Sequence, residues 1–346
     1  MGRSVKVLVT GHRGYLGTAI VSELGARGHD VSGLDKDLYK ISPIELSNVV
    51  SRGVIPWIEK DIRDAEASDF LGFDAVVHLA GLSNDPLGAL DPETTHAINH
   101  RAAVRCAAKA KEAGVSRFLF ASSCSVYGAS DDSVLAEQAE FAPVTAYAES
   151  KLRAETEIAS MADAAFCPVL LRSGTVYGLT AMARFDLVVN NLVAWAVATG
   201  SIRMKSDGSA WRPIVHVADV ARAFAGVLVA DRGAICGQAF NVAVPDGNMQ
   251  ICAIAKAIER AMPACDVTFA GEIDVDQRNY RVDGAKLASV LGANWFQYRF
   301  EEGLAELVTQ LAGLALPVEA FEGPRFQRLA HLKKRLEKAD FGADLR

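Results

Sequence analysis

Short hydrophobic segments rich in β-branched residues alternate with longer amphipathic segments over the first half of the chain. The hydrophobic segments are residues 5–10, 30–34, 54–60, 73–81 and 116–121, whereas residues 18–24 and 99–113 have a helical period. An unbroken hydrophobic run of this length is typical of a strand buried on both faces, as in parallel sheets covered by helices. The alternation therefore predicts an α/β protein with a doubly wound parallel sheet.

The second half of the chain contains further strands and helices at wider spacing. Residues 168–172, 202–205 and 239–243 predict strands, and helices are predicted from about residue 185 and over 251–262. At 346 residues the chain is longer than a single core usually supports, so two lobes are expected.

We expect the sheet domain to comprise residues 1–175 with about 214–233. A smaller C-terminal α/β lobe is expected from residues 176–213 and 234–316. Residues 317–346 form a tail that is charged and helical in pattern, with Arg328, Lys333, Lys334 and Arg335. This pattern predicts a solvated or interface helix without chemistry of its own.

Charge and cysteine content narrow the class of protein. A net charge of −6 disfavours a nucleic acid or an anionic membrane as partner. The chain has no hydrophobic run of membrane-spanning length, and it enters its first strand without a signal peptide. Its six cysteines are scattered without a C-x-x-C motif, which disfavours a disulfide framework or a metal site. We therefore expect a cytoplasmic protein that binds no metal.

A glycine-rich loop joins the first strand to the first helix. Gly11, Gly14 and Gly17 form a G-x-x-G-x-x-G motif that also contains Tyr15 and Leu16. Glycines there let the backbone approach a pyrophosphate, and the helix N-terminus offers it N–H groups and a partial positive charge. The strand–loop–helix order favours dinucleotide binding over a glycine-rich turn without a ligand.

Asp35 follows the second strand at about the distance expected for the acid that binds the adenosine ribose. A carboxylate there repels a 2′-phosphate, so it favours NAD over NADP. Asp37 could take this place, and either residue could be an ordinary loop charge.

Tyr147 and Lys151 lie four residues apart, which places both on one face of a predicted helix. A neighbouring ammonium group lowers the pKa of a phenol, so Tyr147 could act as a general base. Serines 122, 123 and 125 follow the strand at 116–121 and could deliver a hydroxyl to the same place. The Tyr-x-x-x-Lys spacing alone is common, so its weight depends on the motifs before it.

Taken in order, these motifs resemble those of the extended short-chain dehydrogenase/reductase superfamily, and within it the nucleotide-sugar epimerases and dehydratases. The similarity covers roughly residues 5–310 and includes Asp61-Ile62, His78-Leu79-Ala80-Gly81, Asn99 and Val126-Tyr127-Gly128. It implies a Rossmann-type NAD-binding domain and a lobe that binds a nucleoside-diphosphate sugar. It also implies a homodimer formed through the helices near residues 99–113 and 147–161.

The resemblance assigns roles to individual residues. The three glycines would hold the pyrophosphate of NAD, and Asp35 would bind its adenosine ribose. Tyr15 and Leu16 between the glycines would also contact the cofactor. The other cofactor contacts would be Asp61, Ile62, Leu79, Ala80, Gly81, Asn99, Tyr147 and Lys151. The catalytic residues would be Tyr147, Lys151 and Ser123, with Ser123 chosen because it precedes Val126-Tyr127 by three residues. Substrate contacts would come from Ser83, Ser125, Thr175, Asn191, Arg212 and Arg278, with Arg281 as an alternative to Arg278.

Several positions depart from the family pattern. Cys124 and Ser125 stand where the family's dehydratases and decarboxylases carry carboxylates, so elimination and decarboxylation by the usual routes are disfavoured. Cys124 is expected to be a small, partly buried side chain and not a catalytic acid. Thr175 replaces a usual asparagine, and Asn191 could be a helix cap instead of a phosphate contact. His216 and Asp219 are expected to be structural.

These observations predict an NAD-dependent nucleotide-sugar epimerase that acts at sugar C4 through a transient keto intermediate. A one-way 4-ketoreductase or dehydrogenase would use the same residues with an exchanging cofactor. A non-catalytic NAD(H)-binding sensor or scaffold is a third possibility, disfavoured by the intact Ser123, Tyr147 and Lys151. The sequence identifies neither the sugar nor the nucleotide.

Overall fold

The computed structural model describes residues 4–41, 44, 55–83, 91–204, 206–270, 278–338, 342 and 345–346. Its centre is a seven-stranded sheet with the order β3-β2-β1-β4-β5-β7-β11. Every neighbouring pair in this sheet is parallel. The strands are β1 (Lys6–Thr10), β2 (Asp30–Asp35), β3 (Trp57–Glu59), β4 (Ala75–His78), β5 (Arg117–Ser123), β7 (Cys167–Ser173) and β11 (Ala239–Val242). The sheet confirms the predicted doubly wound α/β class.

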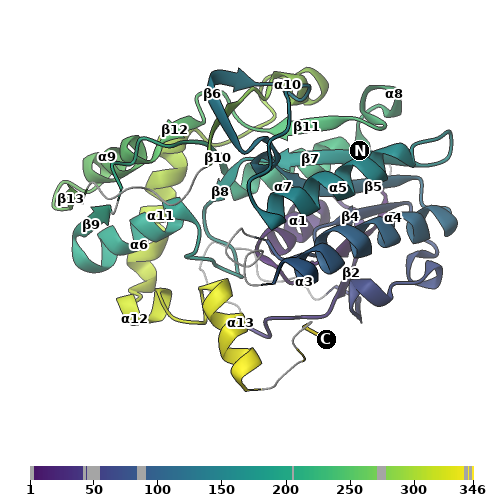
Figure 1. The fold of residues 1–346 in the computed structure, drawn as a ribbon, viewed down its shortest axis with the longest axis horizontal. Coiled ribbons are helices and arrows are strands. Elements are labelled where there is room, and N and C mark those ends of the chain that lie inside the picture. Colours follow the sequence, from purple (N-terminus) through teal and green to yellow (C-terminus); the bar gives the residue numbers. More distant parts are fainter. Residues whose placement is uncertain are drawn as a thin grey trace.

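Helices cover both faces of this sheet (Figure 1). Val7 and Val9 of β1 belong to a hydrophobic cluster with α1 and α7, whereas Leu8 between them belongs to a second cluster with α4 and α5. All three are fully buried, and burying such a side chain contributes roughly 1.5–3 kcal/mol. The helices are α1 (Tyr15–Ala26), α7 (Val217–Val229) and α10 (Ala285–Leu291) on one face, and α4 (Ala103–Glu112) and α5 (Ala146–Ser160) on the other.

The helix expected at residues 99–113 begins earlier. Asp91 caps α3 (Pro92–His96) by accepting from the amides of Glu93 and Thr94, and Pro92 occupies the first helical position. A π-helical segment, η3 (Ala97–Ala102), then joins α3 to α4. Such segments often occur at functional sites, and this one contains Asn99.

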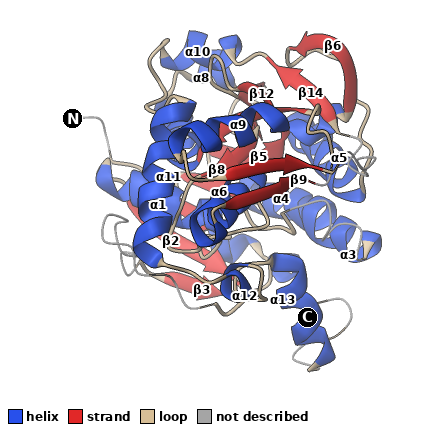
Figure 2. Ribbon diagram, turned by 90° about the vertical axis from the view of Figure 1, so that its left-hand side faces the viewer, coloured by secondary structure: helices blue, strands red, loops and turns tan. Residues whose placement is uncertain are grey.

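The smaller lobe lies beside the carboxyl ends of the central strands (Figure 2). Its own hydrophobic cluster includes Phe185, Val193, Ile254 and Leu307. Its helices are α6 (Val188–Thr199), α9 (Ile251–Ala261), α11 (Phe300–Leu314) and α12 (Val318–Phe321), and its strands are β8 (Thr175–Tyr177), β9 (Ser201–Met204), β10 (Trp211–His216), β12 (Asn248–Gln250) and β13 (Asp266–Phe269).

Two strand positions differ from the sequence prediction. β11 pairs with β7 and completes the edge of the central sheet, although residues 234–316 were expected in the smaller lobe. β6 (Ala129–Leu135) was not predicted; it pairs with β14 (Asn279–Val282), a partner far away in the sequence. Both differences come from pairings between distant segments, which local hydrophobic pattern does not encode.

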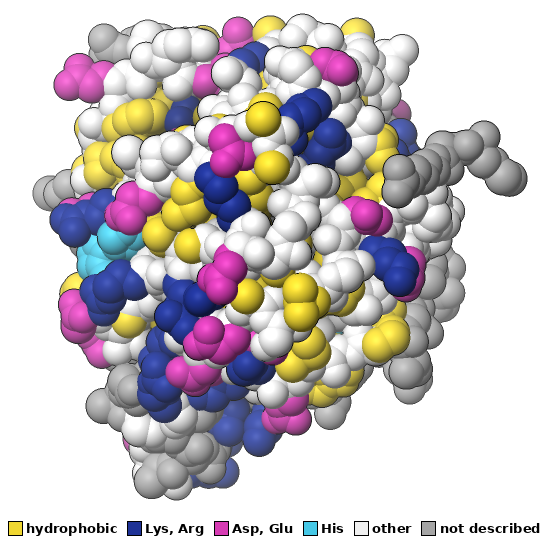
Figure 3. Space-filling model, turned by 90° about the vertical axis from the view of Figure 1, so that its right-hand side faces the viewer, with side chains coloured by type: hydrophobic (Ala, Val, Ile, Leu, Met, Phe, Trp, Pro, Cys, Tyr) yellow, Lys and Arg dark blue, Asp and Glu magenta, His cyan; other side chains and the backbone are white. Residues whose placement is uncertain are grey.

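The remaining elements are short, except for the last helix. They are η1 (Ile62–Asp64), η2 (Ala67–Phe70), η4 (Cys124–Tyr127), α8 (Arg232–Ile235) and the C-terminal α13 (Arg328–Glu337). Within the described ranges, every helix is too short or too polar to cross a bilayer. The face in Figure 3 carries acidic and basic side chains interspersed with small groups of hydrophobic ones.

Candidate active site

A cavity of about 640 Å³ opens at the carboxyl ends of the central strands, where α/β sheets bind their ligands. Its lining includes every predicted site residue except Asn99 and Asn191. The structure thus brings together residues from both halves of the chain, including Gly11, Asp35, Tyr147 and Arg278.

The glycine loop forms one wall of this cavity. Gly11 has a φ of +73°, and a Cβ there would lie 2.6 Å from the backbone nitrogen of Ala80. A Cβ on Gly17 would lie 2.3 Å from the carbonyl oxygen of Gly11. Helix α1 begins after Gly14 without a side-chain cap, so an anion can take the place of one. These features fit the pyrophosphate of a dinucleotide.

Asp35 and Asp61 line the cavity beyond the end of β2. The Asp35 carboxylate accepts the amides of Arg13 (2.9 Å) and Asp37 (2.7 Å), which fix its orientation. Burial raises the pKa of Asp35, and these bonds offset the shift only in part. Asp37, the alternative ribose ligand, is paired with Arg13 at 2.8 Å. Of the two, Asp35 is the carboxylate that the backbone positions.

Asp61 has a different environment. Burial acts to raise its pKa, but Arg63 and Lys36 beside it dominate and lower it to about 2. The carboxylate caps η1 through the amide of Arg63, and Ile62 next to it is buried. Asp61 and Ile62 therefore line the cavity with side chains that the fold holds in place.

Tyr147 and Lys151 lie in the first two turns of α5, where Thr145 caps the helix by accepting from the amide of Ala148. The Lys151 nitrogen lies 6.0 Å from the Tyr147 ring centroid and donates to the Ala121 carbonyl at 2.9 Å. Burial lowers the pKa of Lys151 to about 8. The ammonium is therefore close to its titration point at neutral pH, which suits a group that assists proton transfer.

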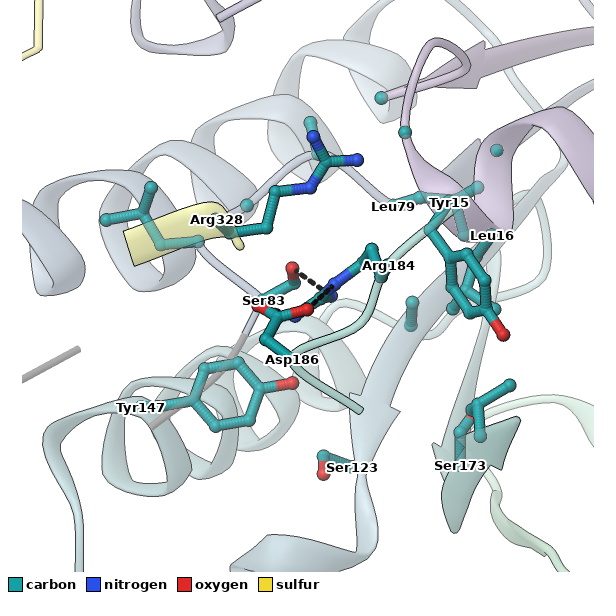
Figure 4. A pocket seen from close by; sticks show the side chains of 18 of the residues that line it. Tyr15, Leu16, Leu79, Ser83, Ser123, Tyr147, Ser173, Arg184, Asp186 and Arg328 are labelled. Carbon is teal, nitrogen blue, oxygen red and sulfur yellow. Dashed lines mark hydrogen bonds and ion pairs between the residues drawn. The ribbon is translucent and has the colours of Figure 1, made fainter. Parts of the chain in front are cut away.

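Ser123 ends β5 and lies at the same end of the pocket as Tyr147 (Figure 4). Its hydroxyl accepts the amide of Ser125 at 3.1 Å, which leaves its own proton free to be donated. Ser122, by contrast, donates to the Glu155 carboxylate at 2.7 Å. Glu155 is in turn paired with Arg172, and Arg172 donates to the Tyr127 hydroxyl at 2.9 Å. This buried network holds the strand end that presents Ser123.

Cys124 and Ser125 stand where the family resemblance would place carboxylates for elimination or decarboxylation. Cys124 is fully buried, donates to the Arg172 carbonyl, and has its pKa raised by burial. It is thus more buried than the sequence predicted and is not poised as an acid. Ser125 and Ser173 are also buried and line the cavity, and their hydroxyls have no hydrogen-bond partner within the described part of the chain. Such hydroxyls are available to a bound ligand.

Arginines line the cavity on the side of the smaller lobe. Arg212 is buried in β10 and donates to the carbonyls of Trp211 (2.9 Å) and Arg278 (2.5 Å), so Arg212 and Arg278 are adjacent. Arg281, the alternative to Arg278, instead stacks on Trp211 at 5.0 Å and is not part of the lining. Thr175 at the start of β8 lines the cavity as well.

Two predicted residues lie outside the lining. The Asn99 side chain exchanges hydrogen bonds with the backbone of Leu82, at 2.7 and 2.9 Å, so it shapes the loop after β4. The Asn191 amide donates to the Phe185 carbonyl and to Glu322, and neither contact faces the cavity. His216 caps α7, and Asp219 accepts the amides of Gln297 and Tyr298, as their expected structural roles require.

Sequence reasoning did not assign several charged residues of the cavity, among them Arg184, Asp186 and Arg328. Arg184 pairs in a bidentate manner with Asp186, at 2.8 and 2.9 Å, and donates to the Ser83 hydroxyl at 2.8 Å (Figure 4). Its position inside the hydrophobic stretch Leu179–Val189 was a usable signal, because a buried charge needs a partner or a ligand. Arg328 belongs to the tail to which no chemistry was assigned.

Comparison with known proteins decides the family. The family model described as the NAD dependent epimerase/dehydratase family matches residues 7–243. The chain belongs to the NAD-dependent epimerase/dehydratase family. This confirms the predicted family, enzyme class and NAD cofactor. The close-packed glycine loop and Asp35 fit that cofactor.

Individual members of the NAD-dependent epimerase/dehydratase family match most of the chain. A UDP-glucose 4-epimerase of Mycolicibacterium smegmatis is 29% identical over 323 residues, which cover 88% of this chain and 97% of that one. The structure of MoeE5 in complex with UDP-glucose and NAD is 26% identical with a TM-score of 0.74 and covers 90% of this chain and all of that one (100%). TunA, an NAD-dependent NDP-hexosamine 5,6-dehydratase, shares the fold, with a TM-score of 0.76 at 22% identity.

Proposed function

We propose that this protein is an NAD-dependent epimerase that inverts C4 of the sugar in a nucleoside-diphosphate sugar. The observation that carries the proposal is the composition of the catalytic end of the cavity. Tyr147, Lys151 and Ser123 line it together, whereas Cys124 and Ser125 occupy the positions of the carboxylates expected for elimination or decarboxylation. Relatives named UDP-glucose 4-epimerase support the same reaction.

The other carboxylates of the cavity are committed elsewhere. Among the described lining residues these are Asp35, Asp37, Asp61 and Asp186. Asp37, Asp61 and Asp186 are each ion-paired, and two backbone amides hold Asp35. An acid for expelling water from the sugar is therefore lacking among them, which supports epimerisation.

In this proposal Tyr147 removes the proton from the sugar C4 hydroxyl and later returns it. Ser123 donates a hydrogen bond to the same oxygen, and Lys151 favours the phenolate by its charge. Gly11, Gly17 and Asp35 would hold NAD, which when bound would supply the hydride chemistry at C4. Arg212 and Arg278 hold the diphosphate, so that the sugar can turn over between the two hydride steps. Ser83, Ser125 and Thr175 are the proposed sugar contacts.

The test is turnover by a Tyr147→Phe variant. Removing the hydroxyl eliminates the proton acceptor, so we expect activity to fall at least about 100-fold, within the usual range for a general base. NAD content should be unchanged. Activity is measured as interconversion of UDP-glucose and UDP-galactose without added cofactor, and a panel of dTDP-, GDP- and CDP-sugars identifies the preferred nucleotide.

Tyr298→Phe serves as the matched control, because Tyr298 lies outside this cavity. It should retain activity. Unchanged turnover in Tyr147→Phe would refute the proposed base, and stoichiometric formation of NADH would show a one-way dehydrogenase.

A further inference from the structure

The C-terminal tail crosses from the smaller lobe to the NAD-binding domain over the cavity. At its start, Phe321 and Phe326 are buried against Phe185 of the lobe, with ring centroids 5.8 and 5.2 Å apart. Further along, Leu332 of α13 is buried in the cluster that contains Leu8 of β1. Figure 1 shows this path, from α12 in the smaller lobe to α13 below the sheet.

The tail is fastened to the loop that follows Asp35. Arg335 donates to the Leu38 carbonyl at 2.5 Å, and the Leu345 carbonyl accepts from Lys36 at 2.7 Å. Gln327, Arg328, Leu329 and Leu345 line the same cavity as the glycine loop. The tail therefore lines the cavity, whereas the sequence predicted a solvated or interface helix without chemistry of its own.

Arg328 is the cation that this wall presents. It is 3% exposed, and its guanidinium carbon stacks 4.3 Å from the ring centroid of Tyr39, which also lines the cavity. Among the described residues, neither the Arg328 Nη1 atom nor the Tyr39 hydroxyl has a hydrogen-bond partner. Buried polar groups without partners are destabilising, and two that face one cavity indicate a ligand.

The acids near Arg328 are already paired. Asp186 is bound by Arg184, and Asp37 is bound by Arg13. Burial lowers the pKa of Arg328 to about 10, although Tyr39, Asp186 and Asp37 nearby act to raise it. Because both acids are paired with other arginines, a bound anion is the partner that the Arg328 guanidinium would take.

The dinucleotide is the anion that fits this place. In Figure 4 the Arg328 side chain leaves α13 and extends toward the side where Leu79, Tyr15 and Leu16 lie. The diphosphate of a sugar nucleotide has its own arginines, Arg212 and Arg278. A 2′-phosphate would meet Asp35.

We propose that Arg328 and Tyr39 bind the pyrophosphate of NAD, so that the C-terminal tail closes over the cofactor. This inference rests on the NAD dependence of the family and not on the identity of the sugar. NAD can then leave only when the tail releases it, which suits a cofactor that is regenerated in every cycle.

The test is calorimetric binding of ADP-ribose to protein stripped of its cofactor. ADP-ribose carries the pyrophosphate without the nicotinamide, so no catalytic step enters the measurement. Losing a charge-assisted hydrogen bond should raise the Kd for ADP-ribose by about 10- to 100-fold in Arg328→Gln. Tyr39→Phe should raise it less, and the Kd values for adenosine and UDP should not change.

Arg335→Gln is the matched control, because it loosens the same helix without removing a group of the cavity wall. It should change the Kd for ADP-ribose less than threefold. An unchanged Kd in Arg328→Gln, an equal loss in Arg335→Gln, or a loss of UDP affinity instead would each overturn the proposal.

Trypsin digestion of the wild-type chain gives a second measurement that needs no variant. Lys333 and Lys334 are exposed on α13. ADP-ribose should slow cleavage at these lysines, whereas adenosine should not. Equal cleavage rates with and without ADP-ribose would contradict closure of the tail. Failure of the Tyr147→Phe test would refute the proposed base and leave this inference standing.

Discussion

Burial sets the ionisation of Lys151, and its charge is the one on which the proposed base depends. The side chain is 4% exposed, and its ammonium donates a hydrogen bond to the Ala121 carbonyl. The same burial that tunes the ammonium also makes its charge destabilising in the folded protein without cofactor. Function and stability are therefore opposed at this residue.

A comparison of wild-type protein with Lys151→Met measures this opposition. The Lys151 pKa is about 8 in the folded chain, against 10.5 for an unperturbed lysine. Between these values the unfolded state binds more protons, so this group makes stability rise with pH. The unfolding free energy of the wild type, relative to the variant, should rise by about 3 kcal/mol between pH 7 and pH 10.5. Urea unfolding of cofactor-free protein checks this, and a flat difference would contradict the buried charge.

Sequence motifs predicted the residues of the catalytic end better than those of the cofactor wall. Tyr147 and Lys151 lie in α5 and Ser123 ends β5, and both elements have clear local sequence patterns. Arg328 and Tyr39 meet only because the tail folds back over almost the whole chain. In sequence, Arg328 looks like any arginine on the solvated face of a charged helix. The local pattern therefore did not predict that it is buried in the cavity wall.

At the scale of elements, the glycine loop shows how backbone shape limits sequence. Gly11 is in the left-handed region, and a Cβ added there would collide with the backbone of Ala80, whereas a Cβ on Gly25 in α1 would meet open space. Gly11 precedes α1, and Gly25 lies in its last turn. Only the first is required by structure.

Alanine substitutions at these two positions should therefore have opposite effects. Gly11→Ala should destabilise the protein by at least about 1–2 kcal/mol and weaken NAD binding, since it strains the backbone and collides with Ala80. Gly25→Ala should stabilise it by roughly 0.5–1 kcal/mol, because alanine is the better helix former. Thermal unfolding with and without NAD measures both. Equal effects of the two changes would contradict the assigned loop geometry.

Element prediction succeeded where hydrophobic runs were long and failed where pairing was distant. Strands β1, β4 and β5 of the central sheet were expected near their observed places, and most of their residues are buried. β6 and β14 were missed or unplaced, because their pairing depends on how the smaller lobe folds back. The π-helical segment around Asn99 likewise has no signature in helical periodicity.

In the whole molecule, the C-terminal tail runs from the smaller lobe to the central sheet and lines the cavity between them. α4 and α5 lie side by side on one face of the sheet and carry exposed ion pairs such as Arg153 with Glu149. The family resemblance expects these helices to form a four-helix bundle with a second copy. The structure of one chain leaves that expectation as a prediction.

Light scattering after size-exclusion chromatography tests this assembly. We expect twice the mass of one chain at micromolar concentration, with or without NAD, because the proposed contact is between helices of two chains and does not include the cofactor. Ala107 and Ala110 of α4 are buried within the chain, so substituting them would disturb the fold and not the contact alone. A mass equal to one chain would contradict the expected homodimer.

The most direct test of the central claim follows the hydrogen at C4 of the sugar. UDP-glucose labelled with deuterium at C4 is incubated with the NAD-containing protein, and the products are analysed by NMR and mass spectrometry. If Tyr147 serves an epimerase, the C4 epimer forms and retains the label at C4. Label found at C6 of a dehydrated sugar, or accumulated in NADH, would contradict the account.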